Sequence, residues 1–179
     1  MIEIPELERR SSFKPTTTSQ ERAWAAIAHV SGVLTLLFSL ASAGVLGLFF
    51  AFVPLIIYFS YKDKSEYVAF HAAQASALQI IGSIGFFVAI LVVTIALVVV
   101  WAITGVLSVI LIGLLLIPVA LLLTVVLALA LVAMPFVLGG FALVATVQTA
   151  DGTDCHYPYL GRYVAEWLER TRTEPVPSV

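Results

Sequence analysis

The sequence predicts an all-α integral membrane protein with four transmembrane helices and a C-terminal amphipathic helix. Hydrophobic residues make up 61% of the 179 residues, and charged residues only 11%. The charges lie in three islands, residues 3–22, 62–66 and 151–174, and the stretches 23–61 and 67–150 between them carry none. These stretches show no alternation of polar and apolar residues, and helices satisfy their own backbone hydrogen bonds in lipid. Helical crossings are therefore expected.

The number of crossings follows from length and from the basic residues. Roughly 20 helical residues cross a bilayer core, so the first stretch fits two crossings and the second fits two to four. Lys and Arg occur in all three islands and are missing from the turns between them. Basic segments stay in the cytoplasm, which predicts an inner (cytoplasmic) membrane protein with both termini cytoplasmic and an even number of crossings. Four is preferred, and six is the alternative, although the turn it needs near Thr124 lacks turn residues.

The N-terminal residues 1–18 mix charge, Ser, Thr and Pro without periodicity, which predicts a disordered cytoplasmic tail. Thr18 and Glu21 have the spacing of a capping box, so the transmembrane domain, residues 19–150, is expected to begin with a helix near Ser19. A cleaved signal peptide is the alternative, because Ala41-Ser42-Ala43 resembles a cleavage site. The long charged leader, which carries acidic residues, and the length of the apolar run argue against it.

Small residues recur along this first helix at alternating steps of three and four. They form a helix-packing seam that consists of Ala25, Ala28, Gly32, Thr35, Ser39 and Ser42. Small side chains let helix backbones approach closely in lipid, so the seam is expected to contact other helices. The alternative is that Ala and Gly are simply common in membrane helices.

The second crossing is expected to begin at Gly44, to be kinked at Pro54 and to end at Tyr61, where an aromatic ring suits the membrane interface. The third helix is expected from Ser65, as N-cap, to Trp101.

A turn is predicted at Thr104-Gly105, followed by a short apolar connector over residues 105–118. The fourth helix then covers residues 119–148, with a bend at Pro135.

Residues 151–172 are predicted to form a cytoplasmic loop and an amphipathic helix, followed by a disordered tail, 173–179. The apolar face of this helix contains Leu160, Tyr163, Val164, Trp167 and Leu168, and i,i+4 charge pairs join Arg162, Glu166 and Arg170. This pattern is typical of a helix that lies on a membrane, and a helix that docks onto a partner protein would have the same pattern.

Two histidines within apolar helices are the sharpest candidates for a site. His29 and His71 are joined by nearby residues in a predicted polar cluster of Arg22, His29, Asp63, Glu66, His71 and Gln74. An ionisable group at such a position needs a partner, and the cluster is interpreted either as a binding or proton-handling site or as a lock between the first and third helices. The lock is the favoured interpretation.

Cofactors, metals and catalytic residues are not predicted, although bound lipid is compatible with the sequence. His29 or His71 could ligate haem or chlorophyll, because imidazole is a common axial ligand, but a lone histidine is weak evidence for such a site. Asp151, Asp154, Cys155 and His156 match no tetrahedral metal motif and are predicted to form a solvated loop. The single cysteine has no internal disulfide partner, and a net charge of -2 does not indicate nucleic acid. We therefore expect a protein that is not an enzyme.

Several segments resemble a known family. They are Glu21-Arg22-Ala23-Trp24 through His29, Pro54-Leu55-Ile56-Ile57, and a motif of Lys62, Asp63, Lys64, Phe70, His71, Gln74, Tyr157, Pro158 and Tyr159. The chain resembles the bacterial Tic20-like domain of unknown function, which is similar to the chloroplast inner-envelope import component and to MamF-type magnetosome membrane proteins. The resemblance implies a four-helix membrane protein with both ends cytoplasmic and supplies no activity. The stretch from His71 to Tyr157 is longer than in the family and suggests apolar surface for a partner.

Two functions are compatible with these patterns. The first is a non-enzymatic membrane subunit or scaffold that packs with other membrane subunits, as a homo- or hetero-oligomer, in the bilayer. The alternative is a small channel or protein-translocation component, in which Gly82, Gly85, Gly139 and Gly140 would line a narrow path.

Overall fold

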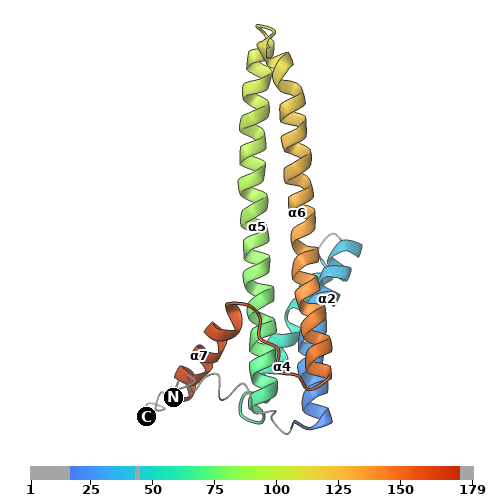
Figure 1. The fold of residues 1–179 in the computed structure, drawn as a ribbon, viewed down its shortest axis with the longest axis vertical. Helices are drawn as coiled ribbons and strands as arrows, with labels where there is room; N and C mark the ends of the chain where they lie inside the picture. The colour runs from blue at the N-terminus through green and yellow to red at the C-terminus, as the bar shows by residue number, and fades with distance from the viewer. Residues whose placement is uncertain (1–16, 43–44, 174–179) are drawn as a thin grey trace, which may run out of the picture. The chain divides into compact units, whose positions relative to one another are not determined.

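The computed structural model describes residues 17–42 and 45–173, and these residues form helices, turns and loops without strands (Figure 1). The helices are α2 (Ser19–Ala41), α3 (Gly47–Ala51), α4 (Val53–Tyr61), α5 (Glu66–Ser108), α6 (Ile112–Ala150) and α7 (Leu160–Thr173). They belong to two compact units. The first contains α2, α3, α4, α7, the start of α5 up to Ile80 and the end of α6 from Leu138. The second contains the remainder of α5 and α6, from Ile81 to Val137.

The predicted capping box opens α2. Glu21 N donates to Thr18 Oγ1 at 3.2 Å, and Thr18 N donates to Glu21 Oε2 at 2.8 Å, so the prediction of a helix from Ser19 is confirmed. Thr18 thus belongs to the helix start rather than to the predicted tail. The rest of that tail, apart from residue 17, and the C-terminal tail from residue 174 lie outside the described residues.

The predicted second crossing consists of two short helices, α3 and α4, separated at Phe52. The predicted kink at Pro54 within a continuous helix is not found. Pro54 stands in the first turn of α4, where its missing amide hydrogen costs no helical hydrogen bond. α3 packs closely on α2, because a Cβ added to Gly47 would lie 1.8 Å from Ser39 Oγ. The predicted start at Gly44 lies outside the described residues.

The larger apolar cluster in the core of the first unit is built from four helices. Buried Ala28 of α2, Ile57 of α4, Val68 of α5 and Val164 of α7 belong to one apolar cluster. The small side chains on α2 and α5 allow close approach, and the larger ones on α4 and α7 fill the remaining space. This packing holds α7 against the helices that carry both histidines.

The second unit is a hairpin of the two long helices, and its turn is not where the sequence predicted. The helix continues through Thr104 and Gly105, where Thr104 Oγ1 donates to Val100 O at 2.8 Å. The turn occupies residues 109–111 instead. The predicted connector over residues 105–118 is therefore wrong, as are the predicted helix end at Trp101 and the start at residue 119.

The geometry of this turn explains its position. Leu111 adopts a φ of 65°, a conformation that non-glycine residues rarely use. Gly113 permits the sharp return of the chain, because a Cβ there would lie 2.2 Å from Thr104 O and from Ser108 N. The turn residues are all apolar, and the exposed fraction of Val109 reaches 85%.

The hairpin turns its small residues inward and its large apolar residues outward. Thr104 is 4% exposed and Ala120 2%, whereas Phe87 is 68% exposed and Leu115 79%. Within the hairpin, Trp101 Nε1 of α5 donates to Thr124 Oγ1 of α6 at 3.1 Å.

Within the described ranges, α2, α5 and α6 are the helices long and apolar enough to span a membrane, and α3–α4 contain a shorter apolar helix over Phe49–Tyr61. The all-helical membrane class is supported, and the count of four crossings stays a prediction.

Candidate functional site

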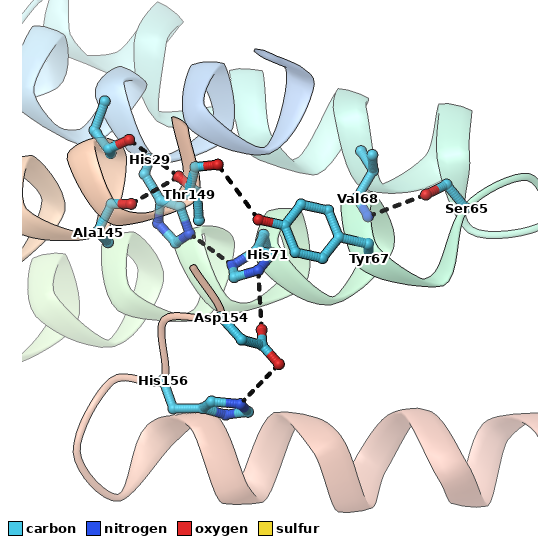
Figure 2. Close-up of polar contacts among 10 residues, drawn as sticks. His29, Ser65, Tyr67, Val68, His71, Ala145, Thr149, Asp154 and His156 are labelled. Carbon is cyan, nitrogen blue, oxygen red and sulfur yellow. Dashed lines mark hydrogen bonds and ion pairs between the residues drawn. The ribbon is translucent and has the colours of Figure 1, made fainter. Parts of the chain in front are cut away.

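Two buried histidines from different helices meet in the first unit (Figure 2). His29 of α2 is 1% exposed and His71 of α5 is 0% exposed. His29 Nε2 lies 3.2 Å from His71 Nδ1, within hydrogen-bonding distance. The neighbouring Ala25 and Ala28 of α2 are fully buried, and their small size lets α2 approach closely enough for the rings to meet.

The loop between α6 and α7 completes the site. Tyr157 Oη lies 2.9 Å from His29 Nδ1, and Asp154 Oδ1 lies 3.3 Å from His71 Nε2. Asp154 Oδ2 in turn lies 3.5 Å from His156 Nε2 (Figure 2). We call these five residues, Tyr157, His29, His71, Asp154 and His156, the histidine relay.

The predicted solvated loop agrees with the structure at Asp151, Asp154 and His156, which are exposed, and is corrected at Cys155. Cys155 is 7% exposed and Tyr157 5% exposed, so the loop packs onto the helices. The ionic end of the site reaches water, because the Asp154 side chain is 32% exposed and that of His156 46%. The relay therefore runs from a buried phenol to a carboxylate at the surface.

The charge state of the loop fixes the direction of the hydrogen bonds. Contacts with His156 and then His71 hold the pKa of Asp154 well below its ordinary value, so the carboxylate is ionised and accepts. Burial raises the pKa of Tyr157, so its hydroxyl keeps its proton and donates.

The tautomers of the two imidazoles follow from these ends. His71 carries its proton on Nε2, toward Asp154, which leaves Nδ1 to accept from His29 Nε2–H. His29 Nδ1 then accepts from the Tyr157 hydroxyl. Both rings are neutral, and every hydrogen points toward Asp154. The last contact, at 3.3 Å, lies outside hydrogen-bonding geometry, so the Asp154 carboxylate attracts the Nε2–H dipole of His71 without a full hydrogen bond.

Gln74 holds the loop backbone one helical turn from His71. Its amide nitrogen, oriented toward the loop, donates to Cys155 O at 3.1 Å, and its amide oxygen accepts from Tyr157 N. Gln74 is fully buried, so these bonds satisfy an otherwise costly amide. Tyr67 adds a hydrogen bond from its hydroxyl to Thr149 O at 3.4 Å, between α5 and the end of α6 (Figure 2).

The predicted polar cluster is only partly assembled. The structure brings His29, His71 and Gln74 together, whereas Asp63 and Glu66 have exposed side chains. The carboxylate at His71 is Asp154 instead. Arg22 lies beside the 151–152 turn, where a Cβ added to Gly152 would be 2.9 Å from Arg22 Cδ.

Two further interhelical contacts were missed from the sequence. Ser65 Oγ donates to Glu21 Oε1 at 2.7 Å and ties the start of α5 to the start of α2. Further along both helices, Gln79 Nε2 donates to Ser31 Oγ at 2.9 Å. Gln79, a further polar side chain in an apolar helix eight residues after His71, was the available signal for the second contact.

The helix-packing seam on α2 contacts three other helices. Gly32 lies against Ala142 of α6, since an added Cβ would be 3.1 Å from that of Ala142. Thr35 Oγ1 donates to Gln79 Oε1 of α5 at 3.2 Å. Ser39 packs on Gly47 of α3. Ser42 Oγ accepts at 2.9 Å from the backbone amide of Leu46, the residue just before α3.

The motif residues are divided between the site and the surface. Phe70 packs beside His71, with ring centroids 5.3 Å apart. Exposed positions are held by Lys62, Asp63, Lys64, Pro158 and Tyr159.

The relay offers little to a metal or haem as it stands. The part of the chain that the structure describes contains no group of three His, Cys, Asp or Glu residues that could hold a metal ion. His29 uses both ring nitrogens, and His71 Nε2 faces Asp154. The site can hold helices together and can pass a change of protonation at Asp154 inward.

The long apolar helices and the histidine relay define a polytopic helical membrane protein whose C-terminal loop is tied to buried histidines. The chain belongs to the MamF/MmsF family, the magnetosome magnetite crystal formation protein family, whose profile matches residues 20–164. The expected likeness to MamF-type proteins is confirmed, and the Tic20-like relationship stays a prediction. Comparison with curated proteins finds no match, and comparison with solved structures finds none either.

Proposed function

We propose that this protein is a non-enzymatic membrane subunit or scaffold that packs with other membrane proteins in the membrane where its family acts in magnetite crystal formation. The observation that carries the proposal is the outward apolar surface of the second unit. The hairpin carries no charge. Its large apolar side chains point outward, and four of them are each more than half exposed: Phe87, Val98, Leu115 and Leu129.

The length of the hairpin helices supports partners in addition to lipid. α5 has 43 residues and α6 has 39, whereas one crossing needs roughly 20. At 1.5 Å per residue, 43 residues extend about 64 Å, roughly twice the hydrocarbon core. Partner helices would cover the apolar surface that a single bilayer crossing leaves over.

The histidine relay supports the scaffold role in a second way. Its contacts join α2, α5 and the loop before α7, and His29 and His71 are closed off from solvent. Interhelical polar contacts of this kind stabilise membrane helix packing. We therefore propose that the relay is a structural lock rather than a catalytic centre.

The channel alternative, in which glycines line a narrow path, has weaker support. A Cβ added to Gly139 would lie 2.7 Å from Leu36 Cδ2, and one added to Gly85 would lie 3.6 Å from Met134 Cε. Side chains therefore occupy the space beside these two glycines, whereas nothing lies within 4 Å of a Cβ added to Gly140. Planar-bilayer recordings of the pure protein test this alternative directly, and a reproducible conductance would favour it over the scaffold.

Gentle detergent extraction followed by native mass measurement tests the scaffold. We expect a complex larger than one 19.3 kDa chain. The double variant Val98→Ala with Leu129→Ala shortens two outward side chains that are each 63% exposed. It should lower the fraction of chains found in the larger complex without lowering the thermal stability of the single chain. Phe59→Ala, a matched exposed position on α4, is the control. A lone monomer in mild detergent and in native nanodiscs would contradict the proposal.

We also propose that the protein lies in the inner membrane with both termini in the cytoplasm. Lys62 is exposed in the turn before α5, and Thr171 is exposed near the end of α7. In a Cys155→Ser background, single cysteines at these positions, Lys62→Cys and Thr171→Cys, should stay unreactive to an impermeant thiol reagent in intact cells and react after lysis. Reaction in intact cells would overturn this topology.

A further inference from the structure

We infer that α7 is seated in the lipid headgroup layer, with one face docked on the protein's own helices and an aromatic face in contact with lipid. This inference is independent of the proposed scaffold role. The sequence placed Leu160, Tyr163, Val164, Trp167 and Leu168 on a single apolar face, and the structure divides that face in two.

The docked face consists of Leu160, Val164 and Leu168. Val164 is 7% exposed and Leu168 9% exposed, and both belong to the core cluster with Ile57 and Val68. These contacts fix the rotation of α7 about its axis. Whatever the other side of the helix meets is therefore set by the fold.

The aromatic face consists of Tyr163 and Trp167, which follow the exposed Tyr159 just before the helix. Their exposed fractions are 84% for Tyr159, 61% for Tyr163 and 50% for Trp167. Tyr and Trp are enriched at membrane interfaces, where the ring meets acyl chains and the polar group meets headgroups. Three such rings along one short segment are therefore suited to lipid.

The contacts of Trp167 set its depth at the membrane boundary. Its ring lies 5.9 Å from the ring of Tyr58 on α4, and Tyr58 packs at 5.3 Å against Phe59, an outward side chain that is 61% exposed. The apolar helix α4 ends at Tyr61, and the exposed, charged residues 62–64 follow at once. Trp167 thus lies within one turn of the change from apolar to charged surface, and its exposed side continues the apolar surface of α4.

The charges on α7 indicate that the aromatic rings, rather than net charge, make the contact. Glu166 lies 3.9 Å from both Arg162 and Arg170, so one carboxylate is shared between two guanidinium groups. The Arg162 guanidinium also lies 5.7 Å from the Tyr163 ring centroid. We therefore infer that the aromatic face of α7 contacts the headgroup layer of a neutral bilayer and that anionic lipid is not required.

Depth-dependent quenching of Trp167 tests the inference. The full chain with Trp24→Phe and Trp101→Phe keeps Trp167 as its single tryptophan and is reconstituted in phosphatidylcholine vesicles. We expect blue-shifted emission and several-fold stronger quenching by a nitroxide placed near the headgroup than by aqueous iodide or by a nitroxide at the acyl-chain end. Replacing a third of the lipid with phosphatidylglycerol should leave this pattern unchanged.

Two outcomes would overturn the inference. Strong quenching by iodide alone would place Trp167 in water, and protection from every quencher would place it against a protein. Val164→Ser with Leu168→Ser, in the same single-tryptophan background, separates docking from lipid contact. It should detach α7 from the core, accelerate tryptic cleavage at Arg162 and Arg170 and abolish the depth preference. A chain that retains the depth preference after this change would show that the docked face does not orient the helix, against the proposal.

Discussion

His29 Nε2 lies 3.2 Å from His71 Nδ1, and neither side chain is more than 1% exposed. The two imidazoles join α2 to α5 through one hydrogen bond, and Tyr157 and Asp154 extend the contact at either end. The order of donors and acceptors has a single direction, so removing any member leaves a neighbour with an unsatisfied polar atom. This makes the relay sensitive to substitutions that conserve size.

His71→Ala should strongly destabilise the protein. The change strands the buried His29 Nε2–H and leaves a cavity between α2 and α5. Unsatisfied buried groups and lost packing together predict a loss of about 2–4 kcal/mol in unfolding free energy. Thermal unfolding in detergent measures this loss. Asp63→Ala, at an exposed residue of the same motif, should leave stability unchanged. Equal melting temperatures for His71→Ala and the parent protein would show that the relay is not a lock.

Tyr157→Phe should have a smaller and more specific effect. It removes the hydroxyl that donates to His29 Nδ1 and keeps the ring. The expected loss is about 1 kcal/mol, the usual cost of one hydrogen bond. The ¹⁵N chemical shifts of His29 should show Nδ1 losing its hydrogen-bond partner while Nε2 stays protonated. A shift pattern with the proton on Nδ1 in the parent protein would reverse the direction assigned to the relay.

The stability of the loop should depend on pH through Asp154 and His156. Asp154 raises the pKa of His156 above its ordinary 6.5, so this stabilisation is complete below pH 6.5 and is lost as pH rises through the raised pKa. The pKa of Asp154 is lowered from 3.8, so its contribution is present above pH 3.8 and is lost only in stronger acid. Maximum protection is expected between these values.

Amide hydrogen exchange of residues 153–157 as a function of pH measures this effect. Because His156 is half-exposed, the change should be below about 1 kcal/mol. His156→Gln should remove the dependence above pH 6.5. A dependence of unchanged size in that variant would assign the titration to another group.

Gly113→Ala should disrupt the α5–α6 turn. The added Cβ would lie 2.2 Å from backbone atoms of Thr104 and Ser108, and backbone cannot move aside as a flexible side chain can. Overpacking of this kind costs about 1–3 kcal/mol. Gly105→Ala is the matched control, because nothing lies within 4 Å of its added Cβ, and a helical Gly→Ala change stabilises by up to about 1 kcal/mol. Opposite signs in thermal unfolding would support the turn geometry, and equal effects would argue against it.

The helical membrane character could be predicted from the sequence because it follows from local chemistry. Charge-free stretches and the capping box at Thr18 act through nearby residues, and α2 begins at Ser19 as expected. The turn of the hairpin could not be found in this way. Thr104-Gly105 has the composition of a turn, but Leu111 supplies the positive φ, and Gly113 serves the close approach of two helices.

The site was half predictable for a similar reason. His29, His71 and Gln74 stand out because polar residues in apolar helices need partners, and the structure gives them partners. Asp63 was expected as a partner because it should lie at a depth similar to that of His71, whereas Asp154 meets His71 only because α7 folds back and packs on α4 and α5. Long-range packing of this kind leaves no periodic signal in the sequence.

The turn at residues 109–111 also affects how the topology of this protein can be mapped. Val109, Ile110 and Leu111 carry no polar side chain, and their backbone amides donate within the turn to Val106, Leu107 and Ser108. No side chain of the turn therefore favours water over the membrane. A glycosylation acceptor or epitope inserted there would be drawn to water by its own polarity, so it would report the position of the tag rather than that of the native turn. The native hairpin should therefore be mapped with small apolar photoreactive probes.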